Sequence, residues 1–279
     1  MAQKAIARRT FELFADQSTD SIFSVMTFLR RSASLVTILL LSCSLWAADL
    51  RITYLANEGV LIQCGSEKML VDALLRDSLD EYARHPPDVQ EKLETGKSPF
   101  DGVQLALATH FHLDHWDAGA ISRFLRNNPN AQFVSTPQAT AMMPWSQRER
   151  MHALWPAVGR SQDFRSGDVT VTAFRLNHGK TQNLGYRISM CGRRLFHLGD
   201  GEGAAEDFTA LRSMGSADVA LVPFWWLLDP QSAAFLRKWK PRHIVAFHFG
   251  ADEERHAQAI RSHWPEVWVC WDQGETHKF

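Results

Sequence analysis

Residues 103–109 read VQLALAT, and residues 110–115 follow at once as HFHLDH. The first stretch is a nearly continuous apolar run, which is typical of a strand that is buried on both faces. The second stretch is rich in imidazole and carboxylate groups, which cannot enter a core unless each finds a polar partner. The sequence therefore predicts a buried strand that ends in a polar site.

Four potential metal ligands lie within this short polar stretch. His110 and His112 alternate along an extended segment, so both imidazoles can face one cation. Asp114 and His115 follow after the chain turns and can face a second cation nearby. The full string His-x-His-x-Asp-His favours a metal site over a solvent-exposed loop that merely contains several histidines.

Three further candidate ligands occupy turns that follow predicted strands. His178 lies in an Asn-His-Gly turn, Asp200 in a Gly-Asp-Gly turn, and His248 two residues before Gly250. Loops at strand ends are where a rigid scaffold presents functional side chains. We therefore expect these three residues to join the site that follows residue 109.

The remaining pattern alternates between strands and helices. Three short stretches with period two, joined by tight turns, predict antiparallel strands between residues 50 and 72, and a short helix with a long loop follows over 73–101. The later chain alternates strand and helix patterns, which predicts a layered α/β domain. Expected strands cover 132–135, 167–176, 183–191, 193–200, 219–224 and 243–249, and expected helices cover 117–127, 230–239 and 252–262.

Residues 49–279 resemble the metallo-β-lactamase superfamily. The resemblance includes the ordered series from His110 to His248 and the openings ITYLANEGVLIQ (52–63) and KMLVDALL (68–75), and it is greatest for lactonase-like and phosphodiesterase-like hydrolases. It implies an α/β fold, a four-layer αββα sandwich with a dinuclear metal site at the edge of the two sheets.

The resemblance also implies a role for each candidate ligand. By that likeness, the first metal is bound by His110, His112 and His178, the second by Asp114, His115 and His248, and Asp200 bridges both. An aspartate at the bridging position departs from the pattern of the enzymes that hydrolyse β-lactams. We therefore do not expect antibiotic hydrolysis.

The chemistry of the predicted site agrees with the resemblance. A mixed nitrogen and oxygen ligand set suits two divalent cations, with Zn²⁺ first and Mn²⁺ or Fe²⁺ as alternatives. Such cations generate a metal-bound hydroxide near neutral pH and polarise a carbonyl or phosphoryl oxygen. Asp114 is the expected catalytic residue, because it can orient the hydroxide and move a proton to the leaving group.

The predicted function is therefore hydrolysis of an ester-like bond in a lactone, thioester or phosphodiester, without a covalent enzyme intermediate. Two other classes remain open at this point. One is an iron-dependent oxidoreductase on the same fold, and the other is a non-catalytic metal-binding protein. The complete second ligand set favours two metals but does not distinguish zinc from iron.

The first 48 residues have the pattern of a leader. Basic residues precede the mainly apolar stretch 32–46, and two alanines end it, as in a signal peptide over about 26–48 with translation starting at Met26. The stretch is too short for a comfortable bilayer span of about 20 residues. We expect a periplasmic or secreted soluble form, with a lipoprotein anchored at Cys43 as the alternative.

Composition limits the partners of the chain. With 30 Lys and Arg against 31 Asp and Glu, the formal net charge is −1, so no nucleic acid is expected as a partner. A small-molecule or lipid-like substrate fits better. Beyond the leader the chain has three cysteines, Cys64, Cys191 and Cys270, which we expect to be buried thiols, with one disulfide as the alternative.

Several other residues allow both a functional and a structural interpretation. Asp72 could fix a ligand imidazole or cap a turn. His197 and the aromatic stretch 224–226 are expected to be structural, although the aromatic residues could line a substrate pocket. Lys180 and Asn183 follow His178 and could contact an anionic substrate group, but by default they are turn residues.

Overall fold

The structure, a computed structural model, describes residues 49–76, 79 and 81–279. The first sheet begins with the three antiparallel strands that the sequence predicts, and it continues through strands that pair in parallel. Its strand order is β14-β1-β2-β3-β4-β5-β6. The strands are β1 (Leu50–Ala56), β2 (Gly59–Cys64), β3 (Glu67–Val71), β4 (Leu105–Leu107), β5 (Gln132–Ser135), β6 (Met151–Ala153) and β14 (Thr276–Lys278).

The second sheet repeats this organisation with the order β13-β12-β11-β10-β9-β8-β7. Hairpins join β7 to β10, and parallel strands follow from β10 to β13. The strands are β7 (Ser161–Ser166), β8 (Val169–Leu176), β9 (Asn183–Met190), β10 (Arg193–His197), β11 (Val219–Pro223), β12 (His243–Phe247) and β13 (Trp268–Val269).

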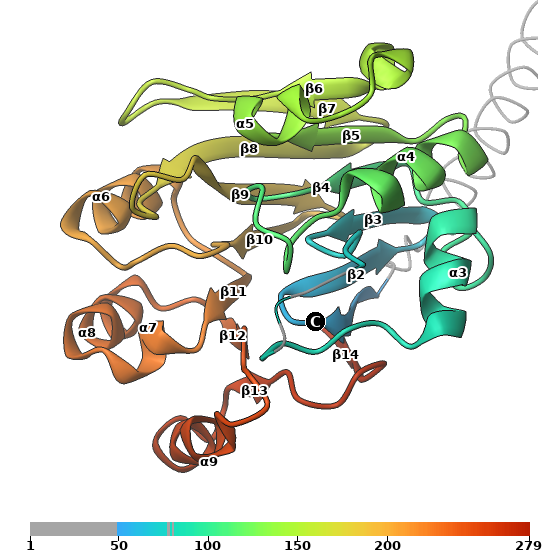
Figure 1. Ribbon diagram of the computed structural model, residues 1–279. Helices are drawn as coiled ribbons and strands as arrows, with labels where there is room; N and C mark the ends of the chain where they lie inside the picture. Colours follow the sequence, from blue (N-terminus) through green and yellow to red (C-terminus); the bar gives the residue numbers. More distant parts are fainter. Residues whose placement is uncertain (1–48, 77–78, 80) are drawn as a thin grey trace, which may run out of the picture. The chain divides into compact units, whose positions relative to one another are not determined.

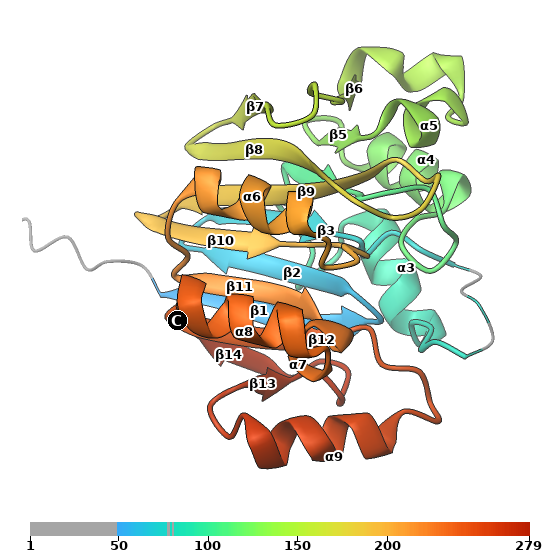
Figure 2. The same ribbon diagram turned by 90° about the vertical axis from the view of Figure 1, so that its left-hand side faces the viewer.

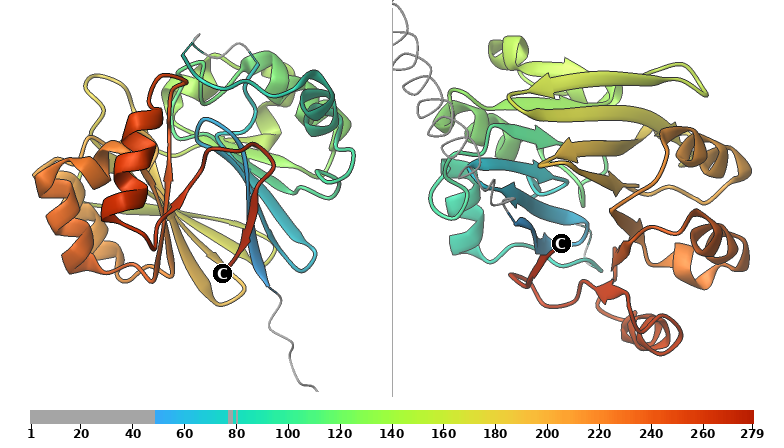
Figure 3. Two further views of the ribbon diagram at one scale, coloured as in Figure 1. Left: turned by 90° about the horizontal axis from the view of Figure 1, so that it is seen from below. Right: turned by 180° about the vertical axis from the view of Figure 1, so that it is seen from behind.

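Helices cover the outer face of each sheet, which confirms the predicted four-layer αββα sandwich (Figures 1 and 2). The view from below in Figure 3 shows the four layers side by side. The first sheet carries α3 (Pro87–Thr95), α4 (Ala118–Asn127), α5 (Pro137–Ala141) and a 3₁₀ turn (Trp145–Arg150); the second carries α6 (Ala205–Met214), α7 (Trp225–Leu228), α8 (Pro230–Trp239) and α9 (Glu254–His263).

Three apolar clusters hold these layers together. The central cluster contains alternate residues of both sheets, such as Ile62 and Tyr186. The two outer clusters join each sheet to its own helices, with Phe124 on one side and Trp226 on the other. Alternation along the strands sends one set of side chains to the centre and the other outward, so both faces of each sheet are buried.

The structure differs from the sequence-based predictions at some elements. The polar edge strand β7 and helix α6 were not expected, and the strand predicted over 103–109 pairs only at Leu105–Leu107. The expectation of free thiols is wrong for Cys64 and Cys191, which form a disulfide that joins the end of β2 to the β9–β10 turn. Cys270 is buried and free, as expected.

The leader predicted over 1–48, including Met26 and Cys43, lies outside the described residues. Within the described part of the chain, no helix is both long enough and apolar enough to cross a membrane.

Candidate metal centre

All seven predicted ligands meet at one edge of the sandwich, where β4, β8, β10 and β12 end. The loop at 110–115 is fixed there by Asp72, at the end of β3. Its carboxylate accepts hydrogen bonds of 2.7 Å from both the N–H and the hydroxyl of Thr109, and one of 3.0 Å from Nδ1 of His115. Because β3 and β4 pair in parallel, their ends lie side by side. Asp72 therefore positions the imidazole of the candidate ligand His115, which is one of the two roles that the sequence allowed for it.

The turn between β1 and β2 supplies two further supports that the sequence analysis missed. Asn57 Nδ2 donates to the backbone oxygen of Asp114 at 3.2 Å and to its Oδ2 at 3.1 Å. Glu58 is fully buried, with one carboxyl oxygen 3.5 Å from His115 Nδ1. Burial raises the pKa of Glu58 well above its usual value, which favours the neutral form of this carboxyl group.

The first ligand group is built mainly from imidazoles. Nδ1 of His112 lies 3.0 Å from Nε2 of His110 and 3.3 Å from Nε2 of His178. Oδ2 of Asp200 lies 3.6 Å from His110 Nε2 and 3.5 Å from His178 Nε2. Ligands about 2.0–2.1 Å from a tetrahedral ion lie roughly 3.3 Å apart. The spacing of these atoms therefore fits one metal ion.

The second ligand group is richer in carboxylate. Nε2 of His115 lies 3.3 Å from Oδ2 of Asp114 and 3.2 Å from Oδ1 of Asp200. Nε2 of His248 lies 3.5 Å and 3.1 Å from the same two oxygens. Asp200 therefore presents one oxygen to each group, which is the geometry of a bridging ligand.

Unpartnered buried atoms give an independent test of the second group. Nε2 of His115, Nε2 of His248 and Oδ1 of Asp200 are buried and have no hydrogen-bond partner within the described residues. Buried polar atoms without partners are costly, and a cation among them would remove that cost. The donor set and these atoms together fit a metal ion.

The electrostatics of the cluster follow from the burial of opposite charges together. Burial alone would raise the pKa of Asp114 and Asp200, but the His115 and His248 imidazoles hold both pKa values far below the usual range. Burial would lower the pKa of His248, yet Asp200 and Asp114 raise it to about 9. Burial and the neighbouring His115 lower the pKa of His110 well below its usual value. The carboxylates are therefore ionised near neutral pH, as metal ligands must be.

His248 sits between two aromatic rings in a left-handed backbone conformation, with φ of +67°. Its ring meets the edges of Tyr82, 4.6 Å away, and Trp225, 5.0 Å away. Phe224 and Trp226, by contrast, are buried in the outer core, and Trp225 packs against it, so the stretch 224–226 is structural, as expected. Tyr82 lies in the loop over 73–101, and nothing in its local sequence marked it as a neighbour of the site.

Two other candidate residues have structural places. His197 is buried, donates from Nε2 to the Glu58 carbonyl at 3.2 Å and accepts at Nδ1 from the Gly199 N–H at 3.3 Å, so it is structural, as expected. Asn183 is buried beside Gly199, where an added Cβ would lie 2.7 Å from its Oδ1. Gly199 also has φ of +49°, so both space and backbone conformation require glycine there.

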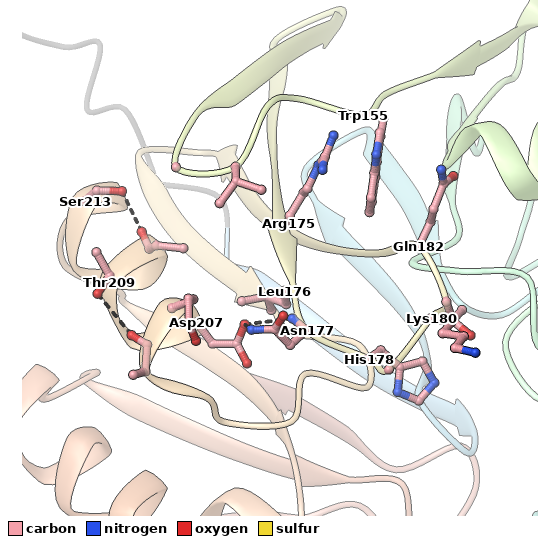
Figure 4. Close-up of a pocket in the computed structure, with 17 residues that line it drawn as sticks. Trp155, Arg175, Leu176, Asn177, His178, Lys180, Gln182, Asp207, Thr209 and Ser213 are labelled. Carbon is pink, nitrogen blue, oxygen red and sulfur yellow. Dashed lines mark hydrogen bonds between the residues drawn. The ribbon is translucent and has the colours of Figure 1, made fainter.

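A cavity of about 510 Å³ adjoins the first ligand group. Figure 4 shows His178 and Lys180 at one end of it, with Trp155 and Arg175 further along. Through His178, the first ligand group therefore borders a space large enough for a small organic molecule.

The αββα sandwich and the histidine and aspartate cluster at its edge define a metallo-β-lactamase-fold protein. The chain belongs to the family described as the beta-lactamase superfamily domain, whose model matches residues 67–263. The resemblance inferred from the sequence is thus confirmed.

Individual relatives agree with this assignment. The UPF0173 protein PF0020 of Pyrococcus furiosus is 29% identical over 218 residues, which cover 75% of this chain and 93% of the relative. Igni18, described as a novel metallo hydrolase from Ignicoccus hospitalis, is 19% identical, with a TM-score of 0.57 over 83% of this chain and 98% of its own. CmlA, a diiron β-hydroxylase from Streptomyces venezuelae, is 13% identical, with a TM-score of 0.55 over 83% of this chain and 54% of its own. These structural likenesses concern the fold.

Proposed function

We propose that this protein is a dinuclear metal-dependent hydrolase that cleaves an ester-like bond in a lactone, thioester or phosphodiester. The observation that carries the proposal is the bridging geometry of Asp200, whose two oxygens face two separate ligand groups. His110, His112 and His178 would hold one ion, and Asp114, His115 and His248 the other. Zn²⁺ suits this ligand set first, with Mn²⁺ or Fe²⁺ as alternatives.

Two such ions supply a water of lowered pKa and polarise a substrate oxygen. The side chains of the protein then position the reacting groups and transfer protons. Asn57 holds Oδ2 of Asp114 in place, so that this carboxylate can orient the attacking water and transfer a proton to the leaving group. Asp72 fixes the tautomer of His115 by accepting from its Nδ1, which leaves Nε2 free as a ligand atom.

The experiment is a metal and activity assay on the full chain. Metal content per chain is measured after loading with Zn²⁺, Mn²⁺ or Fe²⁺, and each form is screened against esters, lactones, thioesters and phosphodiesters. Asp114→Ala should retain its fold and lose activity, whereas Asp163→Asn, at an exposed position on β7, should match the wild type. Full activity of a folded Asp114→Ala protein would exclude the assigned role.

Redox chemistry is the second candidate, and the likeness to the diiron β-hydroxylase CmlA favours testing it. An absorption spectrum of protein purified without added metal separates the two classes. Colourless protein with two zinc ions per chain supports the hydrolase, while a coloured diiron form that consumes dioxygen supports the oxidoreductase. A protein that binds metal but turns over no substrate in either assay fits the third class, a metal-binding protein.

We further propose that the mature domain works in an oxidising compartment, as a periplasmic or secreted protein. The Cys64–Cys191 disulfide supports this, because such bonds persist mainly outside the reducing cytosol. Fractionation of cells that express the full chain, with N-terminal sequencing of the product, tests export and any attachment at Cys43. A product that keeps residues 1–48 and remains in the cytosol would contradict the proposal.

A further inference from the structure

The cavity beside His178 exists because two neighbouring strands end at different places. The last residue pair between β7 and β8 is Ser161 with Phe174, yet β8 continues to Leu176. Arg175 and Leu176 pair only with β9 on the other side. The chain before β7 passes this uncovered edge, and the hollow lies between it, α6 and the β8–β9 loop (Figure 4). The hollow therefore results from the extension of β8 beyond its last pair with β7.

A cation without a charged partner lines this hollow. The Arg175 guanidinium lies over the Trp155 ring, 4.0 Å from its centroid, and the two side chains stand side by side in Figure 4. Its Nε is buried without a hydrogen-bond partner, and no acid of the described residues forms an ion pair with it. Arg76, in contrast, is bound by the carboxylate of Glu94 at 2.6 Å. A buried guanidinium donor without a partner favours an anionic ligand.

Two acidic residues, Glu206 and Asp207, line the same wall, and the buried one, Asp207, is already bound by backbone N–H groups. Asp207 accepts hydrogen bonds from the backbone N–H groups of Asn177, Gly203 and Ala204 at the start of α6. Lys180 adds a second cation to the lining, at the end near His178. The lining therefore presents two cations, Arg175 and Lys180, and one exposed carboxylate, Glu206 on α6.

The backbone spacing between Arg175 and His178 sets the scale of a ligand that reaches both residues. Arg175 and His178 are three residues apart, and three extended residues span about 10 Å at most. His178 has 23% of its side chain exposed and lines the same hollow. The lining includes Leu176, which lies between these two residues in the chain, and Val158. A molecule that reaches both ends needs an apolar section between its reacting bond and its charge.

We propose that this cavity binds the acyl part of the substrate, an aliphatic segment of a few carbons that ends in an anionic oxygen group such as a carboxylate, with Arg175 on the stacked Trp155 as its receptor. The proposal rests on the hydrolase function and assigns a substrate class to the same site. Arg175 is a specificity-determining residue, and it takes no part in the bond cleavage itself.

Two esters that differ only in the terminal charge test the proposal. The wild-type protein should hydrolyse mono-4-nitrophenyl adipate with a KM about tenfold to hundredfold lower than that for 4-nitrophenyl hexanoate, the range expected for a charge-assisted contact. Arg175→Gln should abolish this preference by raising the KM for the adipate ester alone. Arg175→Lys should restore part of it, and Arg165→Gln, at an exposed position on β7, should leave it unchanged.

A binding measurement separates this proposal from the hydrolase function. Calorimetry on the chelator-treated full chain should detect binding of monomethyl adipate and much weaker binding of methyl hexanoate. If the charged ester binds in a manner that depends on Arg175 while no ester, lactone, thioester or phosphodiester is hydrolysed, the cavity assignment stands and the hydrolase function fails. If both esters are hydrolysed equally and Arg175→Gln changes nothing, the cavity assignment fails. If Arg175→Gln does not fold, equal binding of the two esters by the wild type would overturn the proposal.

Discussion

The two halves of the metal centre differ in their exposure and in their supports. In the first ligand group His112 is half-buried and His178 is 23% exposed, and the cavity opens beside them. In the second group the side chains of Asp114, His115 and His248 are between 0% and 4% exposed. The first group, here called the outer half, therefore borders the cavity through His178 although its His110 is buried, and the second group, the inner half, is fully enclosed.

The side chains that hold the candidate ligands in place also differ between the two groups. The second group is held by the buried Asp72 and Asn57, and both His248 and Asp72 have positive φ angles, a strained conformation that persists only where the surroundings enforce it. In the first group, the hydroxyl of Thr181 lies 3.2 Å from Nε2 of the half-buried His112. The inner half is therefore preorganised by the core, whereas the outer half keeps some freedom to adjust to a ligand.

Asp200 belongs to both halves, so its removal should have the largest effect. We expect Asp200→Ala to reduce the metal content of both groups and to lower kcat/KM by about a thousandfold or more, because a bridging ligand and its charge are lost together. Metal analysis and the ester assay measure this change, with Asp163→Asn as the control. Retention of two ions and of activity would show that the halves do not depend on a shared ligand.

Removing a support of the inner half should have the next largest effect. Asp72→Asn takes away the carboxylate that accepts from His115 Nδ1, so we expect about a tenfold to hundredfold loss of affinity for one of the two ions. Stepwise metal titration followed by calorimetry should show a larger weakening of the site with His115 than of the site with His110, which Asp72 contacts only through Thr109. Equal weakening of both sites would contradict the division into two halves.

Most of the ligand set could be predicted because it is encoded locally. The string from His110 to His115 is contiguous, and His178, Asp200 and His248 each follow an apolar strand and precede a turn. In an α/β sandwich such strand ends converge on one edge, so local patterns suffice to place these side chains.

The supports could not be predicted because their burial depends on distant segments. Asn57 and Glu58 have the sequence of an exposed turn, yet both are fully buried, and the Asn57 carbonyl accepts from the His248 N–H at 3.4 Å. The Cys64–Cys191 bond likewise joins residues 127 positions apart. Edge strand β7 was missed because its exposed residues are polar, with no apolar alternation to reveal it.

A support of the outer half should have a smaller effect than one of the inner half. We expect Thr181→Val to raise KM about threefold to tenfold and to change metal affinity less than Asp72→Asn does, because the contact with His112 is partly exposed. Thr276→Val, on the distant strand β14, is the matched control. A loss of metal larger than that of Asp72→Asn would reverse the proposed order of the two halves.

The smallest expected effect concerns His197, which is buried and contacts the Glu58 carbonyl and the Gly199 N–H. Burial lowers its pKa, and Nδ1 must stay unprotonated to accept from the Gly199 N–H. The unfolded chain, with a histidine pKa of about 6.5, therefore binds more protons than the folded chain below that pH. The free energy of unfolding should consequently fall as the pH drops below about 6.5 and should be insensitive to His197 above it.

Chemical unfolding of the chelator-treated protein between pH 5.5 and 7.5 measures this contribution. We expect His197→Gln to be less stable at pH 7.5 but to lose about 1 kcal/mol less than the wild type as the pH falls, since each proton contributes about 1.4 kcal/mol per pH unit. His263→Gln, at the exposed end of α9, should keep the wild-type slope. If His197→Gln keeps that slope as well, the pH sensitivity comes from the candidate ligand histidines, and His197 contributes packing but no pH dependence.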